Sequence, residues 1–465
     1  MKKDFFLTQL KSISPIDGRY ATKVSDLKKY FSEYAFIFYR LKIEIKYLFA
    51  LEKILKDNKT KLPNKQYGLV LNKELRKTLK NILEHNGVDL DQIILDIKEI
   101  EKTTNHDVKS IEYYLQRIFK KCAAEKYVNW IHFGLTSQDI NNTAIPLLLK
   151  DFFNDVYYSE IAQVVKKLED LFSLSKDKVM LAFTHGQPAS PTFVGKEFKV
   201  FTERLKGQLK ILNNLAHKAK FGGAVGNLNA HYFVFPNIDW IDFSNQFVIE
   251  LGLERTQFTT QIEPYDGLSA QLDTVKRINT ILIDLCKDVW QYISMNYFKQ
   301  IPLNREVGSS TMPHKINPID FENAEGNLLI ANALLSFISE KLPISRLQRD
   351  LTDSTVLRNL GVPFAHTIIA FKSIVKGLQK ISINDDKLKK DLNDNWVVVS
   401  EGIQTFLRAI NYPNPYEIVK EFTRNGNNMN QIEFNRFIDK LNINQEWKEK
   451  LKHLEPSQFL GCVPE

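Results

Sequence analysis

Apolar residues recur at steps of three and four positions between residues 194 and 216, and this spacing constrains the fold most. The stripe consists of Val194, Phe198, Phe201, Leu205, Leu209, Leu212 and Ala216. Side chains three and four positions apart share one face of an α-helix, so the pattern predicts a long amphipathic helix. A half-buried β-strand would need alternation at every second position, and such segments are few and short in this sequence.

Two further stripes repeat the same helical spacing. Their members are Ile145, Leu148, Leu149, Phe152 and Val156 in one, and Ile278, Ile281, Leu282, Leu285, Val289 and Ile293 in the other. Long helices joined by short loops rich in glycine and proline are typical of antiparallel bundles. We therefore predict an all-α fold in which the stripes form core and subunit contacts. We expect Gly222 and Gly223 to end the first long helix and Pro343 to close a later one.

The chain divides into three predicted helical domains. Residues 1–126 form a smaller N-terminal domain, and residues 127–375 form a central domain of long helices. The sequence becomes more polar near Lys376 and Gly377, so residues 376–465 are predicted to form a separate C-terminal helical domain.

Charge and composition are those of an ordinary globular protein. Among 465 residues, 43% are hydrophobic, 25% are charged and the formal net charge is +8. This charge fits anionic small substrates or a nucleic-acid partner, but a lysine-rich solvated surface is the favoured interpretation. The basic residues are spread along the chain, so composition gives nucleic-acid binding little support, and we expect no nucleic-acid partner.

The cysteines and the hydrophobic segments indicate a reducing compartment. Cys122, Cys286 and Cys462 are far apart and odd in number, so they predict neither a disulfide framework nor a metal site. No stretch has the length of a membrane span, and the apolar run near the N-terminus is too short for a signal peptide. We expect a cytoplasmic protein with no membrane partner.

Residues 308–318, which read GSSTMPHKINP, are the most informative loop. A glycine and several hydroxyl groups precede Lys315, and a helix is predicted to begin with Asn317 at the N-cap, Pro318 at the first position and Asp320 in the first turn. Helix N-termini and lysine both favour anions. From the spacing alone, an anion site and a generic Ser/Pro loop remain equally open.

The same residues resemble the signature of the fumarase, aspartase and argininosuccinate lyase superfamily. The matching positions are Gly308, Ser309, Ser310, Met312, Pro313, Lys315 and Asn317. Residues 136–142 (TSQDINN) and 184–189 (THGQPA) are similar to other segments of that superfamily. From about Ser12 onward the chain resembles the bacterial adenylosuccinate lyase branch, most closely at residues 17–20 (DGRY), 103–108 (TTNHDV) and 354–359 (STVLRN).

The resemblance implies a carbon–nitrogen lyase of purine nucleotide synthesis. Such an enzyme releases fumarate from adenylosuccinate, giving AMP, and from the succinyl-aminoimidazole carboxamide ribonucleotide. It implies Ser309 as the base, His185 as the acid and Glu322 as the carboxylate that orients the acid. The alternatives are a serine that only binds substrate, a loop histidine that caps a carbonyl and a surface glutamate. No cofactor and no metal are expected.

The resemblance also implies a set of substrate-binding residues. Arginine forks and hydroxyl groups suit a phosphate, and a lysine with polar helix termini suits the succinyl carboxylates. The predicted set is Arg19, Tyr20, Asn105, His106, Asp107, Thr136, Ser137, Gln261, Lys315, Asn317, Asn323, Arg349, Ser354, Thr355 and Arg358.

These residues are scattered between positions 19 and 358, and the superfamily builds each site from three subunits of a homotetramer. The resemblance thus implies a homotetramer with shared active sites and small purine nucleotides as substrates. Two alternatives remain: a relative acting on another substrate such as argininosuccinate, and a non-catalytic helical scaffold or nucleic-acid binder.

Overall fold

The computed structural model describes residues 7–62, 68–301, 312, 314–425 and 429–463. The chain divides into two compact units, each built from three segments. Unit 1 comprises Met1–Ile161, Gln208–Thr280 and Gly326–Lys372, and unit 2 comprises Ala162–Gly207, Ile281–Glu325 and Ser373–Glu465. The three-domain boundaries given above stay a prediction.

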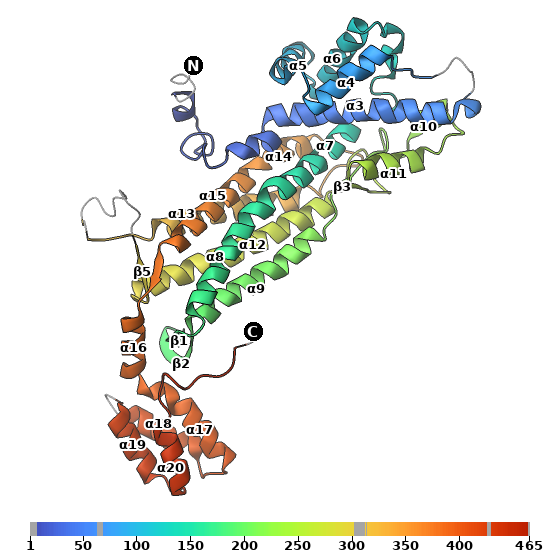
Figure 1. Cartoon of the computed structure of the whole chain (residues 1–465). Coiled ribbons are helices and arrows are strands. Elements are labelled where there is room, and N and C mark those ends of the chain that lie inside the picture. Colours follow the sequence, from blue (N-terminus) through green and yellow to red (C-terminus); the bar gives the residue numbers. More distant parts are fainter. Residues whose placement is uncertain (1–6, 63–67, 302–311, 313, 426–428, 464–465) are drawn as a thin grey trace. The chain divides into compact units, whose positions relative to one another are not determined.

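Helices account for most of the described structure, and the predicted all-α fold is confirmed (Figure 1). Unit 1 contains α2 (Lys28–Phe31), α3 (Glu33–Asp57), α4 (Lys73–Glu84), α5 (Leu90–Thr104), α6 (Asp107–Lys121), α7 (Ser137–Phe152), α10 (Asn229–Val234), α11 (Trp240–Glu250) and α14 (Thr352–Leu357). Unit 2 contains α16 (Asp385–Asp394), α17 (Ser400–Ala409), α18 (Pro415–Asn425), α19 (Gln431–Lys440) and α20 (Gln445–Lys452).

Five long helices contribute residues to both units. They are α8 (Tyr158–Ser175), α9 (Val194–Asn213), α12 (Asp266–Ser294), α13 (Ile319–Lys341) and α15 (Gly361–Gln379). The three apolar stripes fall in α9, in α12 and in α7 with the π-helix Phe153–Tyr157 (η4) that follows it. The helices predicted from the stripes are therefore present.

Two predicted helix boundaries are wrong. Helix α9 ends at Asn213 rather than at Gly222, because Lys218–Ala219 (β3) leaves the helical path and pairs in parallel with Glu254–Arg255 (β4). Helix α13 begins at Ile319, one residue later than expected. The N–H groups of Phe321 and Glu322 both donate to the Pro318 carbonyl, so Pro318 rather than Asn317 occupies the N-cap position.

The described residues also form two short antiparallel sheets in unit 2. Val179–Thr184 (β1) pairs with Gln187–Phe193 (β2), and Phe298–Gln300 (β5) pairs with Ile381–Ile383 (β6). Short 3₁₀ segments lie at Ser25–Leu27, Lys59–Lys61, Glu125–Trp130 and Trp396–Val399.

Local capping explains why several helices of unit 1 begin where they do. The side chains of Ser32, Asn72 and Asp89 accept hydrogen bonds from backbone N–H groups in the first turns of α3, α4 and α5. Helices α4, α5, α6 and α7 all contact α3, the long blue helix in Figure 1. Helix α3 therefore holds the ends of α6 and α7 that carry predicted site residues.

An aromatic cluster forms part of the core of unit 1. The ring of Phe152 lies 4.8 Å from that of Phe31 and 4.9 Å from that of Phe364, between centroids. Phe153 and Tyr157, at the two ends of η4, are buried in the same core. This packing holds the C-terminal end of α7, whereas the predicted site residues lie at its N-terminal end.

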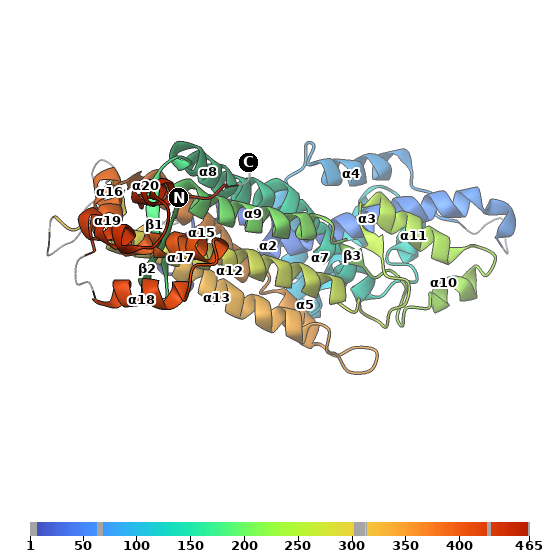
Figure 2. The same ribbon diagram turned by 90° about the horizontal axis from the view of Figure 1, so that it is seen from below.

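The C-terminal helices of unit 2 have an apolar core of their own. Side chains of the 3₁₀ segment Trp396–Val399, of α17, of α19 and of neighbouring segments bury one another, and α17 to α20 lie together in both views (Figures 1 and 2). No helix in the described part of the chain combines the length and the apolar character needed to cross a bilayer.

Candidate active site

The junction between α5 and α6 places three predicted binding residues in consecutive positions. Asn105 ends α5 in the left-handed conformation, with φ of 49°, which asparagine tolerates better than most residues. The His106 Nδ1 atom accepts a hydrogen bond from the Lys109 N–H at 3.1 Å and so caps α6. This bond makes Nδ1 an acceptor and leaves the half-exposed Nε2 edge of the ring for a ligand.

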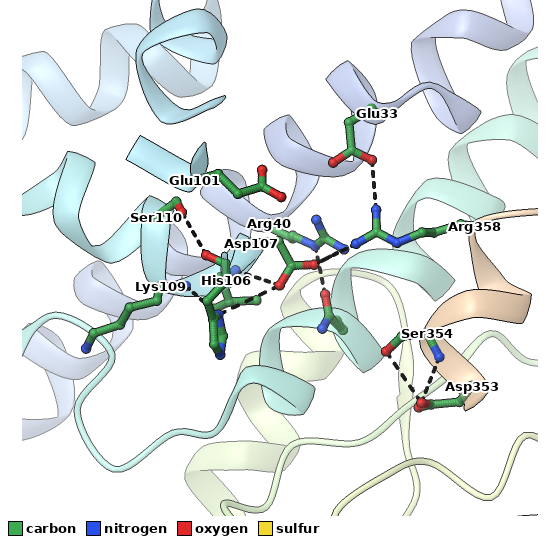
Figure 3. Close-up of polar contacts among 12 residues, drawn as sticks. Glu33, Arg40, Glu101, His106, Asp107, Lys109, Ser110, Asp353, Ser354 and Arg358 are labelled. Carbon is green, nitrogen blue, oxygen red and sulfur yellow. Dashed lines mark hydrogen bonds and ion pairs between the residues drawn. The ribbon is translucent and has the colours of Figure 1, made fainter. Parts of the chain in front are cut away.

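Asp107, the first residue of α6, lies between two arginines (Figure 3). Its Oδ2 atom is 3.1 Å from Arg40 and 2.9 Å from Arg358, and its Oδ1 atom accepts the Val108 N–H at 2.8 Å. Burial opposes ionisation of this carboxyl group, but the attraction of Arg40 and the Val108 bond outweigh it and hold the pKa of Asp107 below its ordinary value. Asp107 is therefore a carboxylate at neutral pH.

Arg358 joins Asp107 to α3. Its other terminal nitrogen donates to Glu33 at 2.8 Å, so one guanidinium spans two carboxylates. Asp107 and Arg358 are 251 positions apart in the sequence, and both were predicted to bind substrate. The fold therefore brings together two of the predicted segments.

Arg40 was missed in the sequence analysis. Only 6% of it is exposed, and its Nε donates to Asn141 of α7 at 2.7 Å while its guanidinium pairs with Asp107. Burial lowers the pKa of Arg40, and Asp107 opposes that effect. No local signal marked Arg40, because Lys42, Glu44 and Lys46 lie in the same stretch and only the packing of the helices buries the arginine against its partners.

Arg349 and Ser354 meet at the start of α14. A terminal nitrogen of Arg349 donates to the Ser354 hydroxyl at 2.9 Å and lies 3.5 Å from the carboxylate of Asp353. Asp353 is buried, whereas Thr355 next to Ser354 is exposed. Two predicted phosphate ligands are thus in direct contact, and Figure 3 shows Ser354 with the Asp353 carboxylate to which it bonds.

Thr136 and Ser137 lie at the N-terminus of α7. The Thr136 N–H donates to Asp139 Oδ2 at 2.8 Å, while Asp139 Oδ1 accepts from Lys220 Nζ at 2.7 Å. Both charged side chains of that pair are fully buried. The predicted carboxylate-binding residues are half-buried and close to the N–H groups that a helix start offers to an anion.

Three predicted residues of unit 1 lie outside these contacts. Arg19 is exposed, and the ring of Tyr20 lies 5.8 Å from the Lys23 ammonium. The side-chain amide of Gln261 donates to the Ala224 carbonyl at 3.0 Å. Among the described residues, no hydrogen bond or ion pair connects Arg19 or Gln261 with Asp107 or Arg358.

His185 occupies the tip of the hairpin formed by β1 and β2 in unit 2. His185 and Gly186 have φ of 52° and 73°, and Thr184 pairs with Gln187 on either side of them. Two successive positive φ values define a tight two-residue hairpin turn. The imidazole is exposed at that tip, so it is free to reach a ligand.

The N-terminal part of α13, also in unit 2, carries Glu322 in its first turn and Asn323 directly after it. Glu322 is exposed and accepts from the Trp290 indole at 3.1 Å, and Asn323 accepts from the Ser373 hydroxyl at 2.9 Å. Lys315 is exposed and Asn317 is half-buried; the Ile316 carbonyl between them accepts from Gln300 at 2.9 Å.

Ser309, the predicted base, lies outside the described residues. Among the described residues of a single chain, no hydrogen bond or ion pair joins Glu322 to His185, so that pairing stays a prediction. The described residues contain no cluster of histidine, cysteine, aspartate and glutamate suited to hold a metal ion.

Comparison with known families places the chain among the lyases. The model of the Lyase family matches residues 18–331. Two solved structures share the fold: β-carboxy-cis,cis-muconate cycloisomerase from Acinetobacter calcoaceticus (TM-score 0.68, 17% identity) and 3-carboxy-cis,cis-muconate lactonizing enzyme from Pseudomonas putida (TM-score 0.69, 16% identity). Each covers 94% of this chain, and the alignments take in 95% and 94% of those chains.

Full-length relatives narrow the assignment. The Adenylosuccinate lyase C-terminal model matches residues 345–460. The adenylosuccinate lyase of Dictyostelium discoideum is 50% identical over 99% of this chain and 98% of its own length. That of Legionella pneumophila is 46% identical over 98% of both chains, and that of Escherichia coli is 42% identical over 98% of this chain and 97% of its own. The chain belongs to the adenylosuccinate lyase family, which confirms the resemblance found in the motifs.

Proposed function

We propose that this lyase eliminates fumarate from adenylosuccinate, giving AMP, and from the succinyl-aminoimidazole carboxamide ribonucleotide, giving the carboxamide ribonucleotide. The names of its full-length relatives support the first substrate. The second substrate is proposed because the same kind of C–N bond is broken in this other purine precursor. Both substrates join a phosphate at one end to a succinyl group at the other.

The contact between Arg358 and Asp107 at 2.9 Å carries the proposal. It places the candidate phosphate ligands of α14 beside the start of α6, where Asn105 and His106 lie. Arg349, Ser354 and Arg358 offer the forked cations and the hydroxyl group that bind phosphate well, with Thr355, Arg19 and Tyr20 as further ligands. In this arrangement Glu33 and Asp107 neutralise Arg358 until a phosphate competes for it.

The succinyl end needs cations and N–H donors. Removing a proton from the carbon beside a carboxylate places further negative charge on that carboxylate, and preorganised donors stabilise it. Thr136 and Ser137 at the start of α7 supply this setting, together with Lys315 and Asn317. Gln261 and Asn323 complete the set of substrate contacts.

The proton steps fall to two side chains. Ser309, as its alkoxide, takes the proton from the carbon, and the electrons of that C–H bond form the double bond of fumarate as the C–N bond breaks. His185 gives its proton to the departing nitrogen, and Glu322 orients its imidazole. The exposed hairpin tip suits this role because the ring can enter a site formed with another chain.

The enzyme works as a cytoplasmic homotetramer whose sites are shared between subunits, with neither nucleic acid nor membrane as partner. Its predicted residues come from segments between positions 19 and 358, which supports assembly of each site from several chains. The chemistry needs no cofactor.

Fumarate release from adenylosuccinate, argininosuccinate and malate, each assayed separately, tests the proposal. We expect turnover of adenylosuccinate and none of the other two. Activity on argininosuccinate alone would assign another member of the superfamily. A salt-sensitive nucleic-acid complex without any fumarate release would favour a non-catalytic scaffold.

A further inference from the structure

Three buried side chains form a continuous path of hydrogen bonds from α7 to α14. The Asn142 amide donates to the Tyr265 hydroxyl at 2.7 Å, and that hydroxyl donates to Asp353 Oδ2 at 3.1 Å. All three residues are almost completely excluded from solvent and belong to unit 1. None of them was among the predicted site residues.

The direction of these bonds is fixed by the backbone. The Glu263 N–H donates to Asn142 Oδ1 at 2.9 Å, so the NH₂ group of that amide must face Tyr265. The phenol then accepts one bond and has its single proton left for Asp353. Replacing any member of the path would leave a buried polar group without its partner.

The backbone of Tyr265 is held in an unfavourable conformation. Its φ of 65° lies in the left-handed region, which is rare for a bulky aromatic residue. The Glu263 carboxylate accepts the Tyr265 N–H and so holds this conformation in place. Strain of this kind persists where the surrounding contacts determine the conformation, and it is concentrated at functional sites.

Asp353 connects the path to the candidate phosphate ligands. Its Oδ2 atom receives the Tyr265 bond, which leaves Oδ1 facing the Ser354 N–H at 2.7 Å, the Ser354 hydroxyl at 3.4 Å and Arg349 at 3.5 Å. One carboxylate therefore contacts both Arg349 and Ser354. The Tyr265 hydroxyl accepts from Asn142 and donates its single proton to Asp353, so it links α7 to this carboxylate.

We infer that Tyr265 is a positioning residue for phosphate recognition: through Asp353 it aligns Arg349 and Ser354 against the phosphate of the substrate. The inference rests on the proposed function, because it assumes that these two residues bind that phosphate. It predicts an effect confined to ligands that carry a phosphate. The bond-breaking groups at the succinyl end are unaffected.

Tyr265→Phe tests the inference, because it removes the hydroxyl and keeps the ring. Tyr157→Phe is a matched control: Tyr157 is also fully buried in unit 1, and its hydroxyl has no hydrogen-bond partner in the described structure. Binding of AMP and of adenosine is measured by calorimetry, and kcat and KM are measured with adenylosuccinate as the substrate.

For Tyr265→Phe we expect AMP affinity to fall about tenfold and KM to rise about tenfold, with kcat within about twofold and adenosine affinity unchanged. Tyr157→Phe should match the wild type in all four quantities. An equal loss for AMP and adenosine, or no loss for AMP, would overturn the inference.

Asp353→Asn provides a second variant, since the amide keeps the shape of the side chain but loses the charge that faces Arg349. We expect it to lose more AMP affinity than Tyr265→Phe while binding adenosine normally; an unchanged ratio of the two affinities overturns the inference even if Tyr265→Phe does not fold. Absence of fumarate release by the wild type would instead reject the proposed function, so the two failures are distinguishable.

Discussion

Asp107 is the residue at which several charges of the candidate site meet. It neutralises the buried Arg40 and also holds Arg358, which is exposed enough to leave for a phosphate. Arg40 in turn bonds to Asn141 of α7, so the carboxylate links three helices. We therefore expect a single change at this position to alter the stability of the protein and, under the proposed function, its binding of phosphate.

Asp107→Asn should destabilise the protein by about 3 kcal/mol at pH 7, because it leaves the Arg40 guanidinium buried without a countercharge. The pKa of Asp107 is lower in the folded state than in the unfolded state, so its contribution is complete above the unfolded value of about 3.9. The contribution is lost as the pH falls through the lower folded-state pKa.

Urea unfolding of the wild type and of Asp107→Asn between pH 7 and pH 3 measures this effect. The difference in unfolding free energy should be constant from pH 7 to about pH 5 and should shrink below about pH 4. A difference that grows on acidification would mean that Asp107 is not a carboxylate stabilised by the two arginines.

At the scale of elements, the first two turns of α7 organise unit 1. Thr136 and Ser137 are the proposed ligands of the succinyl group, while Asp139, Asn141 and Asn142 bond to Lys220, Arg40 and Tyr265 respectively. Each of these partners lies on a different segment of the chain. Displacement of this helix end would therefore disturb the phosphate ligands and the succinyl ligands together.

Lys220→Met should cost about 3–5 kcal/mol of unfolding free energy, because it leaves the fully buried Asp139 carboxylate without its cation. Adding Asp139→Asn should recover more than half of that loss by removing the charge. Lys218→Met is the control: Lys218 lies two positions away and forms an exposed ion pair with Glu254, whose loss should cost less than about 1 kcal/mol.

Urea denaturation at pH 7 compares these variants. If Lys220→Met lost no more unfolding free energy than Lys218→Met, the account of the α7 N-terminus would be contradicted. A double variant with Asp139→Asn that is less stable than Lys220→Met alone would contradict it as well.

At the scale of the whole molecule, the regular elements were predictable and their tertiary contacts were not. The stripes in α7, α9 and α12 gave these helices because their spacing is a local property of the sequence. The start of α13 was displaced by one residue, since Asn317 and Pro318 are both suited to a helix start. The motifs contain Asp107, Ser354 and Arg358, whose contacts the structure shows, while their role in binding substrate stays a prediction.

The residues that support these ligands escaped the sequence analysis for a physical reason. The bond from Arg40 to Asn141 spans 101 positions and that from Asn142 to Tyr265 spans 123. Such pairs depend on how helices pack and leave no local pattern. The positive φ of Tyr265 is likewise imposed by Glu263 and could not be expected of a tyrosine.

The proposed catalytic pair, Ser309 and His185, depends on the whole assembly, because each site is proposed to take residues from several chains. Ser309→Ala and His185→Ala should each lower turnover of adenylosuccinate by about 10²-fold or more while the protein stays folded. If a site takes its serine and its histidine from different subunits, mixed tetramers of the two variants contain some sites with both residues intact.

The most direct measurement is fumarate release from adenylosuccinate by the two purified variants, first separately and then after they are dissociated and reassembled together. Our account predicts two nearly inactive proteins and a mixture that regains activity, with circular dichroism unchanged throughout. Near-normal turnover by Ser309→Ala would contradict the elimination mechanism proposed for this enzyme.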